Sequence, residues 1–330
     1  MKAILCVEHG PAEKLVVRDI AEPVPGEDDA LVRVHAAGVN FPDTLIIENR
    51  YQFKPELPFV PGGECAGVVE AVGAKVRHLR PGMRVMAFTT WGAFAEKVVA
   101  PARNLVPVPD GMDDAVAAAF TIAYATTYHA LVDRATMKAG ESLLVLGASG
   151  GVGLAAVEIG KALGARVIAA ASSPEKLAVC REHGADETID YEREDLRERI
   201  KALTDGKGVD VVYDPVGGRF TELALRSLAW RGRLLVVGFA AGDIPKVPVN
   251  LLLLKGSAML GVFWGDFAKR EPGRLLADLQ SLFAWIRDGT LRPRIAGVYP
   301  LERGAEAIAQ VAARRVSGKL VIRMATAPDG

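Results

Sequence analysis

The segment LVLGASGGVG, residues 144–153, constrains the fold of this chain more than any other part of its sequence. An apolar run leads into a glycine-rich turn, and beyond it Val152, Ala156, Ile159 and Leu163 follow the spacing of one helix face. A strand, a tight turn and a helix in this order are typical of units that hold a pyrophosphate on backbone amides at the helix start. The segment therefore predicts a dinucleotide-binding loop.

The small residues of this loop have separate roles in the dinucleotide-binding template. Ala148 takes the first glycine position, while Gly150 and Gly153 take the second and third. Gly150 leaves room for the backbone to approach a pyrophosphate, and Gly153 lets the helix and the strand pack closely. A purely structural strand-to-helix connection is the alternative, but the agreement of strand, turn and helix with the template favours binding.

The order of the remaining segments predicts an α/β protein. Before about Phe120, short β-branched runs are divided by turn residues, which indicates a β-rich module. From Ser142 onward, strand-like runs alternate with helical stretches, so we expect a doubly wound parallel sheet covered on both faces. After Trp264 come one more helical stretch and a strand-like GKLVIRM, which we expect to rejoin the first module.

Length and charge bound the number of domains and the kind of partner. With 330 residues, 50% of them hydrophobic, the chain exceeds the usual size of a single core. Lys plus Arg and Asp plus Glu both total 40, so no net charge attracts nucleic acid or an anionic membrane. We therefore expect two domains and a small-molecule partner.

The spacing of the cysteines and the hydropathy of the chain indicate the cellular compartment. Cys6, Cys65 and Cys180 lie far apart and form no paired spacing typical of structural zinc or a redox pair. The N-terminus becomes charged too early for a secretory signal, and no stretch approaches the roughly 20 apolar residues of a membrane span. We expect a cytoplasmic protein in a reducing environment, with no membrane association.

The residues that follow the second strand of the sheet concern the choice of cofactor. A chain that binds NAD usually carries an acid there for the ribose hydroxyls, and this chain has Ala171 instead. Ser172, Ser173 and Lys176 follow and offer hydroxyl groups and a cation to a 2′-phosphate. Taken singly, Ser173 fits a helix cap and Lys176 a solvated helix residue. The missing acid together with the cation favours NADPH.

Several short segments, spread over nearly the whole chain, carry a resemblance to a known family. They are GVNFPDTL (38–45), PFVPGGECAGVVEAVG (58–73), PGMRVMA (81–87), TTYHAL (126–131), GESLLVLGASGGVG (140–153), VDVVYDPVGG (209–218), GRLLVVGFA (232–240) and SGKLVI (317–322). In this order they resemble the quinone oxidoreductases that include zeta-crystallin, zinc-free members of the medium-chain dehydrogenase/reductase superfamily.

The resemblance implies an architecture and a set of cofactor residues. Residues 1–122 and 265–330 would form a GroES-like catalytic domain, a partly open β-barrel, and a Rossmann NADPH-binding domain over residues 123–264 would be inserted between these two parts. The implied residues are Ser149, Gly150, Gly151 and Val152 for the pyrophosphate; Ser172, Ser173, Lys176 and Tyr191 for the 2′-phosphate; Thr126, Phe239 and Phe263 for the nicotinamide side; and Arg315 or Lys319 for the ribose phosphate or the cleft. Phe239 and Phe263 fit ordinary core positions equally well.

The same resemblance bears on metal binding. Zinc dehydrogenases of this superfamily have a cysteine ligand at the position of Asn40 and a histidine at that of Gly63. A zinc site needs three protein ligands, so we expect no bound metal here. Glu64 and Cys65 are interpreted as turn and packing residues.

Without a metal, the acceptor must take a hydride without strong polarisation, which quinones and α,β-unsaturated carbonyls do because the charge delocalises. We expect Asn40 to donate to the acceptor oxygen or to the nicotinamide ribose, and Tyr51 to donate a hydrogen bond or a proton. A turn residue and a loop aromatic are the structural alternatives. The family often has a second tyrosine where this chain has Leu45, which makes the pocket more apolar.

Two other functions and one assembly remain open at this point. Related reductases of the same fold act on enoyl thioesters, and the lens crystallin relatives show that an NADPH-binding protein with little turnover can serve structurally or as a sensor. By resemblance, the strand-like SAMLGVFW pairs across a homodimer.

Overall fold

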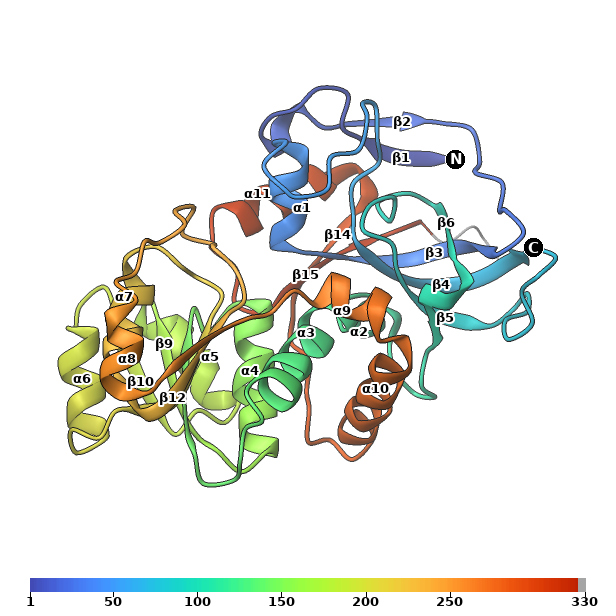
Figure 1. Cartoon of the computed structure of the whole chain (residues 1–330). Helices are drawn as coiled ribbons and strands as arrows, with labels where there is room; N and C mark the ends of the chain where they lie inside the picture. The colour runs from blue at the N-terminus through green and yellow to red at the C-terminus, as the bar shows by residue number, and fades with distance from the viewer. Residues whose placement is uncertain (326–330) are drawn as a thin grey trace. The chain divides into compact units, whose positions relative to one another are not determined.

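The computed structural model describes residues 1–325 of the chain, which form two compact units. The first consists of Met1–Ile122 together with the segment from Pro293 onward, and the second of Ala123–Arg292 (Figure 1). No helix within residues 1–325 is both long enough and apolar enough to cross a membrane.

The second unit is built on a six-stranded parallel sheet with the order β10-β9-β8-β11-β12-β13. In chain order this is third, second, first, fourth, fifth and sixth, the order of a doubly wound dinucleotide-binding sheet. Because the strands are parallel, the loops after their carboxyl ends all lie at one edge of the sheet. The strands are β8 (Ser142–Leu146), β9 (Arg166–Ala171), β10 (Glu187–Asp190), β11 (Val209–Asp214), β12 (Leu228–Val236) and β13 (Ala258–Gly261).

Helices alternate with these strands along the chain (Figure 1, green to orange). Residues suited to helix ends lie at both ends of helix α5. Ser173 Oγ accepts the N–H of Lys176, Pro174 opens the first turn, and Gly184 follows the end with φ +102°. The helices are α4 (Gly151–Ala162), α5 (Pro174–Glu182), α6 (Leu196–Leu203), α7 (Arg219–Arg226), α8 (Asn250–Lys255), α9 (Trp264–Arg270) and α10 (Pro272–Arg287), preceded by a helical stretch over residues 121–134 that includes α3 (Thr126–Tyr128).

The return to the first unit lies after Arg292, not after residue 264 as expected from the sequence. Contacts within the second unit explain the difference. Arg274 of α10 pairs with Asp133 at 2.6 Å, and the Phe267 ring of α9 stacks on His129 at a centroid distance of 3.8 Å. Helices α9 and α10 are thus packed on the Rossmann unit, although they follow its last strand.

The first unit contains a seven-stranded, mostly antiparallel sheet with the order β14-β15-β3-β4-β5-β7, in which β6 also pairs with β3. Its strands are β3 (Asp29–Val39), β4 (Glu64–Val72), β5 (Arg84–Phe88), β6 (Lys97–Pro101), β7 (Leu105–Pro107), β14 (Ile295–Pro300) and β15 (Lys319–Arg323), with β1 (Lys2–Leu5) and β2 (Val16–Asp19) as a separate pair. Its α-helices are α1 (Phe41–Ile47), α2 (Asp114–Ala118) and α11 (Gly304–Ala312).

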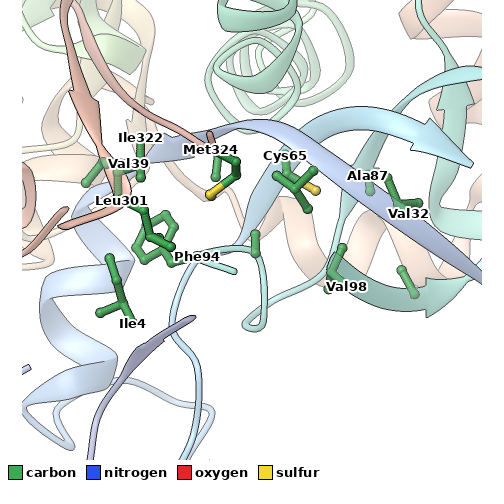
Figure 2. Close-up of a cluster of buried hydrophobic side chains, with 14 of the residues drawn as sticks. Ile4, Val32, Val39, Cys65, Ala87, Phe94, Val98, Leu301, Ile322 and Met324 are labelled. Atoms are coloured by element: carbon green, nitrogen blue, oxygen red, sulfur yellow. The ribbon is translucent and has the colours of Figure 1, made fainter. Parts of the chain in front are cut away.

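The C-terminal strand is an integral part of this unit. Strand β15 pairs antiparallel with β3, with Leu320 opposite Val39. Figure 2 shows Ile322 and Met324 in one buried cluster with Ile4 and Phe94, which come from the N-terminal part of the unit. The pairing places the residue before Leu320 beside the point where β3 ends and α1 begins.

Candidate active site

The turn after β8 requires glycine at a position that the sequence template did not assign. Gly147 has φ +58°, in the left-handed region, where a side chain is strained. The N–H of the next residue, Ala148, donates to Ala170 O at 3.0 Å and fixes the turn against β9. The template placed its first glycine at position 148 and so missed Gly147.

Gly153 and Gly150 differ in what a side chain would meet. A Cβ on Gly153 would lie 2.4 Å from Gly147 O and 2.8 Å from the Ala148 backbone, so the helix needs glycine there to approach the turn. A Cβ on Gly150 would meet only Gly147 O, at 3.4 Å, which is an ordinary contact. Packing within the protein therefore explains Gly153 but not Gly150, whose space is open to a ligand.

The predicted pyrophosphate residues lie at the start of α4. Gly150 is the residue before the helix, Gly151 and Val152 form its first turn, and Ser149 is 5% exposed. The first amides of a helix have no acceptor inside it, so this end suits an anion. Thr127 Oγ1 lies 3.3 Å from Val152 O and 2.9 Å from the hydroxyl of Tyr213 in β11, which ties the helix start to the sheet.

Ser172, Lys176 and Tyr191 belong to the same edge of the sheet. Lys176 Nζ donates to Ser172 Oγ at 2.9 Å, and the N–H of Tyr191 donates to Ala171 O at 3.2 Å. Ser173 lies between them as the cap of α5. A cation and hydroxyl groups thus follow the end of β9, where Ala171 is 1% exposed and carries no acid.

One carboxylate does end the neighbouring strand. Asp190 is 6% exposed, and its Oδ1 accepts the N–H of Glu192 at 3.1 Å. Its Oδ2 lies 3.7 Å from Arg193 Nε. Its own loop therefore engages Oδ1, while Oδ2 is buried without a hydrogen-bond partner in the described part of the chain.

The other predicted cofactor residues lie in different parts of the two units. Thr126 begins α3, Phe239 follows β12 with 36% exposure, and Phe263 precedes α9 with 45% exposure, all in the second unit. A Cβ on Gly217 would come within 2.9 Å of the Phe239 ring, so that ring covers the loop after β11. Arg315 lies in the first unit, after α11, and is exposed.

Asn40 sits at the junction of β3 and α1 in a closed polar cluster of the first unit. It is 7% exposed. Its Oδ1 accepts from Lys319 Nζ at 2.5 Å, and its Nδ2 donates to Glu64 Oε1 at 2.9 Å and to Gly38 O at 3.3 Å. Both amide hydrogens are thus used within the protein, the one toward Gly38 at a distance beyond the ordinary range.

Lys319 and Glu64 form a buried ion pair in this cluster. The distance from Lys319 Nζ to Glu64 Oε1 is 3.0 Å, and the side chains are 7% and 1% exposed. Lys319 also donates to Val39 O at 3.0 Å, and Glu64 Oε2 accepts the N–H of Ile122 at 2.8 Å. The sequence interpretation of Glu64 as a turn residue did not include its charge partner, which lies 255 residues away.

A second carboxyl group, Asp43, lies next to this pair and was not identified from the sequence. It is 2% exposed and accepts the N–H of Asn40 at 2.7 Å. Burial raises the pKa of Asp43 to about 7, while the Asn40 N–H and the charge of Lys319 act in the opposite direction. Proton uptake by Asp43 near neutrality limits the negative charge buried in the cluster.

Tyr51 follows α1 and is half-buried against the core of the first unit, with its ring edge-on to Phe53 at 5.8 Å. Burial raises the pKa of the Tyr51 phenol, and the nearby Asp43 carboxylate raises it further. Within residues 1–325 the hydroxyl has no hydrogen-bond partner. Tyr51 therefore keeps its proton at neutral pH and has it available to donate.

Comparison with known proteins agrees with both units. Residues 26–110 match the family model described as alcohol dehydrogenase GroES-like domain, and residues 151–281 match that described as zinc-binding dehydrogenase. A quinone oxidoreductase-like protein 2 homolog of Nematostella vectensis is 39% identical over 97% of this chain and 88% of the relative, and the quinone oxidoreductase of Pseudomonas aeruginosa is 40% identical over 97% and 99%.

A solved structure shows the same likeness. The crystal structure of Escherichia coli quinone oxidoreductase complexed with NADPH has a TM-score of 0.91 and 31% identity, over 98% of this chain and 100% of the other. A Rossmann unit inserted in a GroES-like unit defines an oxidoreductase of the medium-chain dehydrogenase/reductase type. Within that superfamily, the chain belongs to the quinone oxidoreductase family.

The description of the second family model mentions zinc, but the polar cluster around Asn40 does not fit that metal. Gly63 offers no ligand, and burial raises the pKa of the Cys65 thiol to about 12, which disfavours the thiolate that zinc requires. The ammonium of Lys319 already pairs with Glu64. Within residues 1–325, no group of three or more His, Cys, Asp or Glu side chains is placed to hold a metal ion.

Alanine substitutions at Gly150 and Gly153 should have different effects on stability and on cofactor binding. Gly153→Ala forces a Cβ against backbone atoms and should lower the free energy of unfolding by about 1–3 kcal/mol. Gly150→Ala meets no such obstacle and should change it by less than about 1 kcal/mol, yet weaken dinucleotide binding. Urea unfolding and NADPH titration of both variants separate the effects. A Gly150→Ala protein that binds NADPH as the wild type does would show that the cofactor does not need the open space at Gly150.

Proposed function

We propose that this protein transfers a hydride from NADPH to a quinone or to an α,β-unsaturated carbonyl, without zinc. The observation that carries the cofactor assignment is the edge of the parallel sheet, where Lys176 and Ser172 follow β9 and no acid ends that strand. The Escherichia coli relative, solved with NADPH, supports the same assignment. When bound, NADPH supplies the hydride, and this chain's residues hold the cofactor and the acceptor.

On the cofactor side, we assign the predicted residues to three tasks. The start of α4 holds the pyrophosphate on backbone amides, and Lys176 with its serine neighbours and Tyr191 holds the 2′-phosphate. Thr126, Phe239 and Phe263 face the nicotinamide side. From the family resemblance, we keep Arg315, which is exposed, as a candidate contact of the ribose phosphate.

On the acceptor side, the phenol of Tyr51 is the donor that the structure favours. Its hydroxyl is unengaged within residues 1–325, and its raised pKa keeps the proton in place. Hydride addition to a conjugated acceptor spreads negative charge onto an oxygen, which a neutral donor can hold. An isolated ketone concentrates the charge and requires stronger polarisation. Conjugated acceptors therefore suit a site without metal.

Asn40 is the second proposed donor. Its bond to Gly38 O, at 3.3 Å, is the weaker of its two amide bonds and is the one that an acceptor oxygen or a ribose hydroxyl can replace. Its bond to Glu64 holds the amide in place during the exchange. Asn40 thus contributes one hydrogen bond at the acceptor while it stays anchored in the cluster.

We further propose a cytoplasmic homodimer. The three cysteines are unpaired, in keeping with a reducing compartment. Strand β13 forms the edge of its sheet, and the adjoining α8 exposes Leu253 and Leu254 at 82% and 67%. A second copy covers such an edge and such apolar residues by symmetric pairing of the two sheets.

The cofactor assignment predicts a selective loss of NADPH affinity. Lys176→Ala removes a charge-assisted bond to the 2′-phosphate, worth roughly 1.5–3 kcal/mol, so NADPH binding should weaken about 10- to 100-fold. NADH binding should stay nearly unchanged, because NADH lacks that phosphate. Lys201→Ala, at an exposed lysine of α6, is the control. Equal affinity of the wild type for NADPH and NADH, measured by fluorescence titration, would contradict the assignment.

The acceptor assignment predicts a pattern of turnover. With NADPH saturating, quinones and cyclohexenone should be reduced and cyclohexanone should not. Asn40→Ala should lower turnover about a hundredfold, the usual cost of one donor to a developing anion, with a smaller change in NADPH affinity. Tyr51→Phe should give a lesser loss of the same kind. Full turnover in both variants, or equal rates with cyclohexanone and cyclohexenone, would place the chemistry elsewhere.

Enoyl thioesters belong in the same acceptor panel. Faster turnover with an enoyl thioester than with any quinone would move the assignment to that class of reductase. Absence of NADPH oxidation with every acceptor would instead indicate a binding protein with a structural or sensing role.

A further inference from the structure

We propose that Lys319 is a positioning residue of the reduction, which fixes the Asn40 amide from the C-terminal strand, and that it does not contact the cofactor phosphates. This role rests on the proposed function, because Asn40 is assigned there as a donor to the acceptor. Lys319 was expected from the family resemblance to reach the ribose phosphate or the cleft. Its contacts in the structure point to a different task.

The hydrogen-bonding capacity of Lys319 is used inside the first unit. An ammonium group has three N–H donors, and the three acceptors within reach are Val39 O, Asn40 Oδ1 and Glu64 Oε1, at 3.0, 2.5 and 3.0 Å. The residue is 6% exposed. No donor is left for a phosphate, and the ammonium would have to break a buried ion pair to reach one.

These contacts restrict the Asn40 side chain to one orientation. Its carbonyl oxygen faces a cation, so a flipped amide would place its N–H groups against the ammonium of Lys319. Glu64 Oε1 accepts from both the amide nitrogen and the ammonium, which closes a ring of three side chains. A donor held in one orientation before the acceptor arrives loses less conformational entropy and needs less reorganisation in the reaction.

The fold makes this arrangement depend on the end of the chain. Strand β15 pairs with β3 so that Leu320 lies opposite Val39, which brings the preceding residue, Lys319, to the end of β3. The Lys319 backbone N–H donates to Arg294 O at 2.9 Å and holds the start of β15. Strand β15 thus positions the Lys319 ammonium, which orients the side chain of Asn40.

The test separates positioning from both cofactor contact and simple charge balance. Lys319→Met leaves Glu64 as a buried charge without its partner and is expected to be less stable. The double variant Lys319→Met/Glu64→Gln carries no buried charge at either position, so its unfolding temperature should return toward that of the wild type. Arg323→Met, at an exposed arginine of the same strand, is the matched control.

Turnover at saturating NADPH and the Kd for NADPH are measured for each variant. Because Glu64 also holds the Asn40 amide, Glu64→Gln alone is the reference for the double variant. If Lys319 positions Asn40, turnover of the double variant with a quinone falls on the order of 100-fold below that reference, while the Kd changes less than about threefold. Adding Asn40→Ala to the double variant should then cause little further loss. A Kd raised tenfold or more with unchanged turnover would overturn the proposal in favour of a phosphate contact.

Recovery of turnover in the double variant would overturn it in favour of charge balance alone. Wild-type protein that reduces no conjugated acceptor would overturn the proposed function and the role of Lys319 with it. Wild-type activity with an unaffected double variant would overturn only the role of Lys319.

Discussion

The buried ion pair between Lys319 and Glu64 is the interaction on which the proposed acceptor site depends. Moving either ion out of water costs several kcal/mol, which only close contact and complete hydrogen bonding can offset. Both conditions are met, because every acceptor and donor of the pair is engaged by Asn40, Val39 or Ile122. The pair orders the end of β3 and the start of β4 around one fixed positive charge.

This charge is a physical reason why the polar cluster of Asn40, Glu64 and Lys319 does not fit a zinc ion. A zinc ion requires several converging ligands, at least one of them usually anionic, and here the available carboxylate is already neutralised by Lys319. Asp43, whose pKa is raised to about 7, adds a group that takes up a proton instead of a cation. Because the charges of the cluster are paired within it, the proposed reaction relies on the cofactor and on neutral donors.

The second unit solves a separate problem, the binding of a polyanion. In the function proposed above, it uses the pre-oriented backbone amides at the start of α4 and the cation of Lys176, which follows a strand that ends without an acid. The residues proposed for the 2′-phosphate and the neutral donors proposed for the acceptor lie in different units, so variants of each can be tested separately.

The sequence predicts the second unit well because its signals are local. The strand, turn and helix over residues 142–162 and the cap at Ser173 depend on residues close together in the chain, and all of them lie at the predicted places. The first unit is harder because its cluster joins residues 40, 64 and 319, and no local pattern shows that Lys319 meets Glu64. The sequence also does not predict that Asp43 is buried, because an aspartate at this position fits the solvated start of a helix equally well. The prediction that the second domain ends at residue 264 was wrong for a similar reason, because the contact of α10 with Asp133 joins residues far apart in the sequence.

The polar cluster around Asn40, in which Lys319 pairs with Glu64, allows the proposed absence of zinc to be tested most directly. Native mass spectrometry of protein purified without chelators measures the zinc bound per chain, and the same spectrum gives the number of chains in the assembly. The account predicts a dimer with far less than one zinc per chain. A mass that includes one zinc per chain, together with loss of quinone reduction when that zinc is removed and recovery when it is restored, would contradict it.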